Sequence, residues 1–253
     1  KDHLFINELQ FENEEKIFKD RIKFNFKIKE ISQGKKLLDN LNIPENSKII
    51  LIAGRDNDWA YLYKKKFDIK NWDIEKYLEQ ESYRNINIDT FRDAALKLVD
   101  LGYYVVRVGT PTKNKFNFEN NTKIIDYANS KFRSDFGDIY LGKVCSFYFG
   151  SDSGIINVPK IFGKPVAHIG TDILHIYACA AHQPIPFIPK IAVDKETGKK
   201  IKLKNFLEYD LVRVKSNNYH FNRKNKAYFL NNSAEDIEHF AVECDKMFKK
   251  KLI

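Results

Sequence analysis

The sequence predicts an α/β fold, in which a right-handedly wound parallel sheet carries helices on both faces. Apolar runs of strand length alternate with segments whose apolar residues recur at helical spacing, as in parallel strands joined by crossover helices. The strand-length runs are continuously apolar, which is typical of strands buried on both faces. With 253 residues, of which 43% are hydrophobic, the chain can bury at least one full core.

Residues 147–169 predict a βαβ unit. An aromatic run of strand length leads into a turn of small polar residues, Ser151 to Gly154, and helical spacing then continues to Phe162. Pro165 prevents the helix from continuing into the next strand. Such a turn exposes backbone N–H groups and hydroxyls at a helix N-terminus, which favours a phosphate or carboxylate.

A simpler interpretation of the same turn stays open. Ser151 or Ser153 would then do no more than cap the helix that follows.

Residues 48–53 predict a central strand, and a polar cluster follows at its carboxyl end, where ligands of open α/β sheets bind. The guanidinium of Arg55 in this cluster could grip a diphosphate with two hydrogen bonds. The alternative is a surface ion pair of Arg55 with Asp56 or Asp58, which would contribute little stability.

Residues 59–88 mix aromatic and charged side chains without a clean period. We expect a long, partly ordered insertion here, such as a lid or an acceptor-facing loop. A helix over 89–101, capped by Asp89, and strands over 103–108 and 124–128 should follow it.

The carboxyl-terminal part predicts a helix over 173–181, a hairpin between 188–193 and 201–203, and a last helix capped by Ser233. At the other end, residues 22–28 alternate like a half-buried strand and residues 32–41 have helical spacing. We expect residues 1–46 to form an N-terminal segment and residues 47–253 to form the main domain. The chain begins with Lys, so we expect the natural start and part of an N-terminal domain to be missing.

The net charge of +9 comes from lysines spread along the whole chain. A basic surface suits phosphate-bearing ligands, nucleic acid or an anionic membrane, and scattered charge makes nucleic acid the least favoured partner. The three cysteines are widely spaced, which favours free thiols in a reducing compartment. No CxxC or His-rich spacing indicates a metal site.

Polar groups follow four of the predicted parallel strands, so they should gather along one rim of the sheet. The groups are Arg55 with Asp56, Arg107 with Thr110, Asp126 with Tyr127, and Ser151 with Asp152, Ser153 and Gly154. The sequence contains no GxGxxG, GxxxxGK[ST] or GxSxG motif, which argues against a dinucleotide oxidoreductase, a P-loop NTPase and an α/β-hydrolase.

The order of several short motifs resembles a family of bacterial glycosyltransferases of the GT-B type, and at longer range the nucleotide-binding domains of fucosyltransferases and heptosyltransferases. The resemblance runs from about Gly34 to the last helix. It rests on Ile50-Leu51-Ile52-Ala53-Gly54-Arg55-Asp56, Tyr83-Arg84-Asn85, Gly102 to Gly109, Ile125-Asp126-Tyr127-Ala128 and Gly150-Ser151-Asp152-Ser153-Gly154.

The resemblance implies a Rossmann-like domain that binds a nucleotide-diphospho-sugar, with residues 1–46 as a remnant of an acceptor domain. Arg55 would contact the donor diphosphate. The residues expected around the phosphate, ribose or sugar are Arg107, Asp126, Tyr127, Ser151, Asp152, Ser153 and Gly154. Related transferases carry a His two positions before the Arg, where this chain has Ala53.

The implied reaction transfers a sugar to an acceptor hydroxyl, with Asp56 or Asp58 as the base, and needs neither a metal nor another cofactor. The expected partners are the nucleotide-sugar donor and a glycan or lipid-linked acceptor of surface polysaccharide synthesis. We expect a cytoplasmic protein that contacts an anionic inner membrane peripherally. The alternatives are a binding module without turnover, and a sugar-nucleotide epimerase that recruits His168 or His175.

Overall fold

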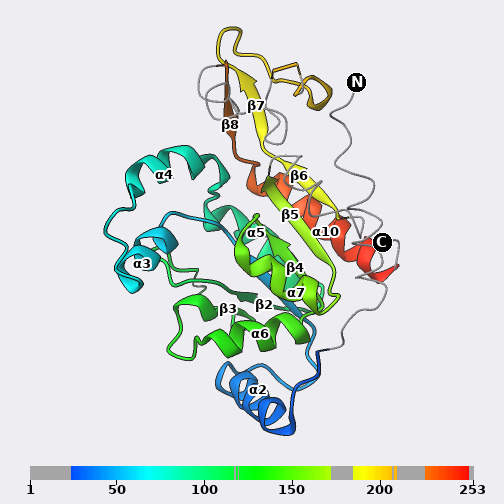
Figure 1. Ribbon diagram of the computed structural model, residues 1–253. Helices are drawn as coiled ribbons and strands as arrows, with labels where there is room; N and C mark the ends of the chain where they lie inside the picture. Colours follow the sequence, from blue (N-terminus) through cyan, green and yellow to red (C-terminus); the bar gives the residue numbers. More distant parts are fainter. Residues whose placement is uncertain are drawn as a thin grey trace, which may run out of the picture.

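The computed structural model describes residues 24–116, 118, 120–171, 185–206, 208–209 and 226–250. Its centre is a six-stranded sheet in the order β3-β2-β1-β4-β5-β6, in which every neighbouring pair is parallel (Figure 1). The strands are β1 (Ile49–Ala53), β2 (Tyr104–Arg107), β3 (Ile124–Asp126), β4 (Phe147–Gly150), β5 (Val166–Thr171) and β6 (Phe187–Pro189). This strand order is that of a Rossmann-like doubly wound sheet, so the predicted α/β fold class is confirmed.

The strand order reverses between β1 and β4. From β1 the chain proceeds outward through β2 to β3, then returns to β4 and proceeds outward on the other side. In such sheets the connections after the two central strands diverge to opposite faces and leave a crevice at their carboxyl ends. Arg55 follows β1 and Ser151 follows β4, so both lie at this crevice.

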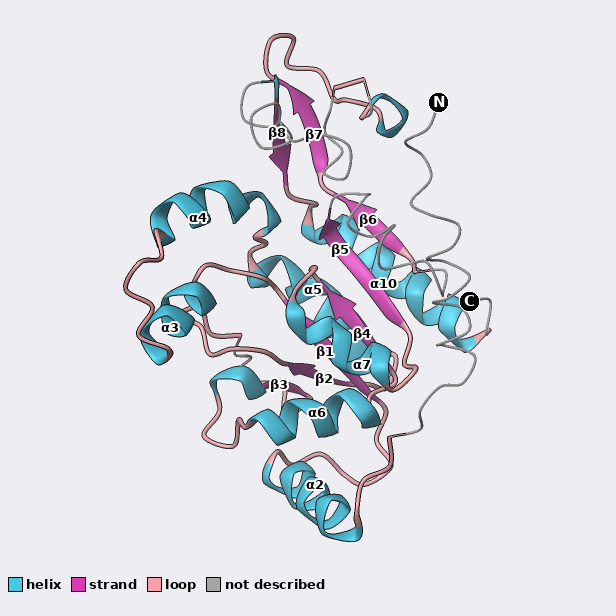
Figure 2. Ribbon diagram, viewed as in Figure 1, coloured by secondary structure: helices cyan, strands magenta, loops and turns pink. Residues whose placement is uncertain are grey.

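Helices cover both faces of the sheet (Figure 2). Ile50 and Ile52 of β1 pack in one core cluster with α5 (Arg92–Asp100) and α10 (Ala234–Lys249). Ile49 and Leu51 pack in the opposite cluster. The helices on that second side are α2 (Ile28–Asn40), α6 (Asp135–Val144) and α7 (Asn157–Ile161). Burial on both sides explains why β1 is apolar at every position.

The last helix, α10, begins as predicted. Ser233 is its N-cap, with Oγ accepting from the backbone N–H of Asp236, and the Asp236 carboxylate accepts from the Ser233 N–H. The helix lies against α5, and Tyr103 Oη donates a 2.6 Å hydrogen bond to Asp245 Oδ1. The last helix therefore completes the core of the first half of the chain.

Residues 59–88 are more regular than predicted. They form α3 (Asp58–Lys66), α4 (Ile74–Glu81) and the 3₁₀ turns η1 (Ser82–Arg84) and η2 (Ile88–Phe91). Ile74 and Leu78 are one helical turn apart and are buried together with Ala60. Trp59 and Trp72 pack beside them. This small apolar cluster stabilises the two helices. Asn87 caps the turn before α5 in place of Asp89.

The predicted hairpin is wrong in its pairing. The turn near Gly198 forms, and Val193 bridges to Lys200, but β7 (Ile191–Asp194) pairs mainly with β8 (Ala227–Leu230). Residues 201–202 are not a strand, and the 3₁₀ turn η5 (Leu203–Asn205) follows. The residues before β7 form β6 at the edge of the main sheet, the place where a strand tolerates prolines.

The predicted strand over 22–28 is also wrong in its described part. Residues 24–27 have no regular structure, and α2 begins at Ile28, where the Lys27 N–H donates to the Glu30 carboxylate. Leu37 and Leu38 of α2 belong to the main core, so this helix is continuous with the α/β domain. The predicted helix over 173–181 lies outside the described residues.

Two of the cysteines, Cys145 and Cys244, are buried free thiols, as predicted. Among the described helices, none is long and apolar enough to cross a membrane.

Candidate functional site

The loops after β1 and β4 are locked together at the reversal of strand order. The Arg55 N–H donates to Ser151 Oγ at 2.6 Å, and the Ser151 N–H donates to the Ala53 carbonyl at 2.9 Å. Tyr148 Oη donates to the Ser151 carbonyl at 3.0 Å. Ser151 is fully buried, so its hydroxyl joins the two loops instead of facing solvent.

A cavity of about 380 Å³ lies beside this junction. Five of the residues predicted for the site line it, namely Arg55, Asp56, Arg107, Ser153 and Gly154. The remaining wall includes Trp59, Tyr77, Val108, Gly109, Thr110, Thr112 and Ile155. The distant segments that carry Arg55 and Ser153 therefore meet at one crevice, as the strand pattern predicted.

Arg55 is 9% exposed and is held by the helices that follow β1. Its Nη2 donates to Tyr77 Oη at 3.1 Å and lies 4.0 Å from Glu81 Oε2, and its guanidinium carbon is 5.6 Å from the centroid of the Trp59 ring. Within the described part of the chain, its Nε is buried and has no hydrogen-bond partner. A buried N–H of this kind normally has an acceptor, so Arg55 points to an anionic or polar ligand in the cavity.

Asp152 belongs to a buried ionic chain behind the cavity. Arg84 Nη1 is 2.9 Å from Glu81 Oε2, and Arg84 Nη2 is 3.0 Å from Asp152 Oδ2. Burial acts to lower the pKa of Arg84, but the hydrogen bond to Glu81 and the charge of Asp152 outweigh it and raise the pKa. Arg84 therefore ties the 3₁₀ turn η1 to the loop after β4.

Of the two predicted base candidates, Asp56 lines the cavity and Asp58 does not. Asp56 is half-buried, and burial raises the pKa of its carboxyl, although the nearby N–H of Asp58 and the charges of Arg107 and Arg55 act to lower it. Asp58 Oδ2 instead accepts from the Lys113 N–H at 2.6 Å, and Asp58 does not line the cavity. Asp56 is therefore the better placed base.

Arg107 lines the cavity but is almost fully buried, and its guanidinium is bound by the loop after β2 and by Asp126. Its Nη2 donates to Thr112 Oγ1 at 2.6 Å, its Nη1 donates to the Asn114 carbonyl, and Nη1 lies 3.6 Å from Asp126 Oδ2. The same carboxylate oxygen of Asp126 accepts from the Phe116 N–H. These two predicted site residues thus order the loop after β2, and Asp126 does not reach the cavity.

Tyr127 is fully buried under α6 and does not line the cavity. Its hydroxyl donates to the Ser134 carbonyl and accepts from the Ser134 N–H, next to the N-cap of α6. The 3₁₀ turn η3 (Tyr127–Asn129) replaces the end of the strand predicted over 124–128.

The helix predicted after Ser153 is divided. A 3₁₀ turn, η4 (Gly154–Ile156), precedes the five-residue helix α7, which contains Pro159 and therefore lacks one backbone donor. The dipole available to an anion is correspondingly small. Ser153 makes no side-chain capping bond, and a Cβ built on Gly154 would meet nothing within 4 Å. The backbone at Gly154 is thus open to close approach by a ligand.

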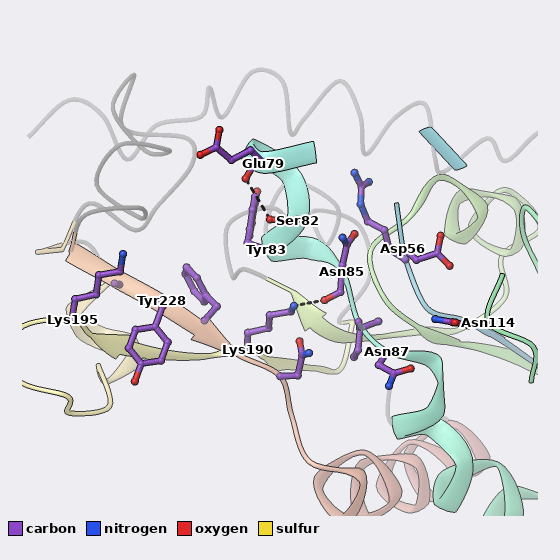
Figure 3. A pocket seen from close by; sticks show the side chains of 15 residues that line it. Asp56, Glu79, Ser82, Tyr83, Asn85, Asn87, Asn114, Lys190, Lys195 and Tyr228 are labelled. Carbon is purple, nitrogen blue, oxygen red and sulfur yellow. Dashed lines mark hydrogen bonds between the residues drawn. The ribbon is translucent and has the colours of Figure 1, made fainter. Parts of the chain in front are cut away.

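A second cavity, of about 580 Å³, shares Arg55 and Asp56 with the first (Figure 3). It lies between two parts of the chain. One is the end of α4 together with η1, and the other is the two-stranded antiparallel sheet of β7 and β8. Sequence reasoning missed most of this wall, which includes Glu79, Ser82, Tyr83, Asn85, Ile86, Asn87, Asn114, Lys190, Lys195, Tyr228, Phe229 and Asn231. The sequence signals for it were the Tyr83-Arg84-Asn85 motif and the aromatic and charged stretch over 59–88, which predicts a lid or an acceptor-facing loop.

His168, one of the residues considered for an epimerase, is fully buried in β5 and lines neither cavity, while His175 lies outside the described residues. In the described ranges, no three His, Cys, Asp or Glu side chains gather as possible metal ligands. No protein-family model matches this chain, and no curated protein does.

Proposed function

We propose that this protein is a metal-independent glycosyltransferase of the GT-B type, which transfers a sugar from a nucleotide-diphospho-sugar donor to an acceptor hydroxyl. The observation that carries the proposal is Arg55, whose buried Nε has no hydrogen-bond partner among the described residues and which lines the cavity where the strand order reverses. Nucleotides bind at that point in doubly wound sheets. The order of the sequence motifs, which resembles that of GT-B transferases, supports the same reaction.

The donor diphosphate would lie between Arg55, Ser153 and Gly154. A guanidinium offers a planar fork of donors that fits phosphate oxygens. The open backbone at Gly154 lets a phosphate come close without meeting a side chain.

In the proposed step an acceptor hydroxyl attacks the anomeric carbon of the donor sugar, and its proton passes to the Asp56 carboxylate. The bond between the anomeric carbon and the diphosphate oxygen breaks, and its electron pair leaves with the nucleoside diphosphate. Arg55 stabilises the charge that builds on this leaving group. The raised pKa of Asp56 suits a general base, because it brings the carboxyl closer to the working pH.

The transferase would act in surface polysaccharide synthesis on the cytoplasmic side of the membrane. Support for peripheral contact with anionic lipid comes from α3, where Tyr61, Leu62 and Tyr63 are exposed directly before the lysines at 64–66. Exposed aromatic residues beside lysines favour the headgroup region of an anionic bilayer.

Nucleotide binding tests the proposal first. GDP, UDP, CMP and dTDP are added to the full chain, and the thermal unfolding temperature and Kd are measured. Arg55→Ala should weaken binding of the nucleoside diphosphate by about 10–150-fold, as expected for one charge-assisted contact of about 1.5–3 kcal/mol. It should leave binding of the matching nucleoside nearly unchanged.

Arg92→Ala serves as the control, because Arg92 on α5 has a side chain that is 42% exposed and lines neither cavity. Equal loss of nucleoside and diphosphate binding in Arg55→Ala would overturn the diphosphate contact. Donor turnover in a panel of sugar nucleotides separates an enzyme from a binding module, and an isomerised sugar product would identify an epimerase.

A further inference from the structure

We infer that the second cavity is the acceptor site and that its ligand is an uncharged oligosaccharide. This inference rests on the proposed function, which leaves open both the place and the class of the acceptor. The cavity shares Arg55 and Asp56 with the donor cavity, so a hydroxyl bound in it can reach the proposed base. Its volume of about 580 Å³ lies within the range of about 300–1,000 Å³ typical of small-ligand sites.

The polar part of the wall consists mainly of amides and hydroxyls. Asn85, Asn87, Asn114, Asn231, Ser82, Tyr83 and Tyr228 all line the cavity. Such groups both donate and accept hydrogen bonds, as sugar hydroxyls do. A wall of this kind matches a ligand that carries many hydroxyls and no net charge.

The apolar part of the wall is mainly aromatic, with Ile86 and Ala227 as its aliphatic members. Tyr83 approaches from η1 and Phe229 from β8, with ring centroids 6.2 Å apart, and Tyr228, which precedes Phe229 on β8, also lines the cavity. Aromatic faces offer flat apolar surface with a polar edge, which suits the C–H face of a pyranose ring. Amides and aromatic rings together therefore favour a carbohydrate over an aliphatic chain.

The charged groups argue against a lipid diphosphate in this cavity. Lys190 is buried, and its Nζ donates to the Asn85 carbonyl, so this cation is used in joining the two walls (Figure 3). Glu79 and Asp56 add negative charge to the same wall. The other two cations of the wall are Arg55, which the proposed function assigns to the donor diphosphate, and the exposed Lys195 at the end away from Asp56. No excess of cations is therefore left near Asp56 for a second diphosphate.

The residues that line the cavity extend along the proposed path of transfer. Figure 3 shows Lys195 and Tyr228 toward one end and Asp56 with Asn114 toward the other. An oligosaccharide lying along it would place its terminal hydroxyl near Asp56 and its remaining sugars against the two-stranded sheet of β7 and β8.

Binding of sugars to the full chain tests the inference. Lactose, maltose, cellobiose and N,N′-diacetylchitobiose are the uncharged probes, dodecyl phosphate is the charged lipid probe, and binding is followed by saturation-transfer NMR with the nucleoside diphosphate present. Tyr228→Ala and Asn231→Ala should each weaken binding of the recognised disaccharide by about two- to tenfold. Both residues are exposed, so neither change should alter the fold.

Tyr61→Ala is the matched control, because Tyr61 is 44% exposed and lies outside both cavities, while Tyr228 is 43% exposed. Nucleoside diphosphate binding should stay unchanged in all three variants, which separates failure of this inference from failure of the donor site. The inference is overturned if no disaccharide binds, if dodecyl phosphate competes for the same residues, or if Tyr228→Ala and Asn231→Ala bind sugar as well as the wild type.

Discussion

The backbone N–H of Arg55 donates a 2.6 Å hydrogen bond to Oγ of Ser151, a residue 96 positions further along the chain. This bond joins the two loops that diverge at the centre of the sheet. The hydroxyl of Ser151 also lies 3.4 Å from the Ala53 carbonyl. This junction fixes the wall of the cavity that is the proposed donor site, which lowers the entropy lost on binding.

Ser151→Ala should destabilise the fold and weaken nucleotide binding together. The change leaves the buried Arg55 N–H without its acceptor, which costs about 1–3 kcal/mol. Urea unfolding and nucleoside diphosphate titration measure the two effects. Ser233→Ala is the control, because loss of this helix cap costs about 0.5–2 kcal/mol and Ser233 lines neither cavity. Undiminished nucleotide affinity in Ser151→Ala would show that the loops hold their positions without this bond.

Gly154→Ala should leave the unliganded fold intact and impair nucleotide binding. The added methyl meets no atom of the protein within 4 Å, so the free energy of unfolding should stay unchanged or rise by about 0.4–1 kcal/mol. In the complex the methyl would crowd the diphosphate at a cost of about 1–3 kcal/mol, which raises the Kd by about 5–150-fold. Melting curves with and without the nucleotide check both parts. An unchanged Kd would place the ligand away from Gly154.

Asp56→Asn should abolish sugar transfer far more strongly than Asp58→Asn. Removal of a general base lowers the rate by about 10²–10⁴-fold, and donor binding should persist because the cavity keeps its shape. Asp58→Asn should cost only a few-fold, since Asp58 acts by holding the Lys113 N–H. Single-turnover rates and donor Kd values are the measurements. The assignment of the base would be reversed by a larger loss of rate in Asp58→Asn.

The free energy of unfolding should decrease as the pH rises from about 4 to 6, because of Asp138. Burial raises the pKa of its carboxyl from 3.8 to about 6, although the Arg133 guanidinium at 2.8 Å acts to lower it. The folded state then holds this proton more tightly than the unfolded chain, so the stabilisation is complete below pH 4. It is lost as pH rises through the folded pKa, by up to about 3 kcal/mol.

Asp138→Asn should remove this part of the pH dependence, because an amide does not ionise. Unfolding free energies at pH 4 and pH 7 give the result. Asp135→Asn is the control, since Asp135 also pairs with Arg133 but its side chain is 80% exposed. An unaltered slope in Asp138→Asn would assign the pH dependence to another group.

The central strands and the last helix were predictable because burial imposes a strong pattern on them. Ile49 to Ala53 is apolar throughout since both faces are covered, and Ser233 marks a helix start with a local hydrogen bond. The pairing of β7 with β8 was not predictable, because about 30 residues separate the two strands in sequence. The helices α3 and α4 were missed because their aromatic residues pack on one another and obscure the helical period.

For the site, sequence predicted which segments meet but not which side chains face the ligand. Polar residues follow each strand end, yet Ser151 and Asp126 turn toward the protein, while Asp56 and Ser153 line the cavity. A strand ending fixes where the backbone arrives, and the direction of each side chain depends on partners from other segments. Tyr77, which holds Arg55, comes from one such segment.

The packing of α10 against α5 also bears on how the chain matures on the ribosome. The hydrogen bond between Tyr103 and Asp245 spans 142 residues, so at a synthesis rate of about 5–20 residues per second the partner of Tyr103 emerges roughly 7–30 seconds later. During that interval the apolar face of α5 lacks its cover and is open to chaperones, or to the same face of a neighbouring nascent chain.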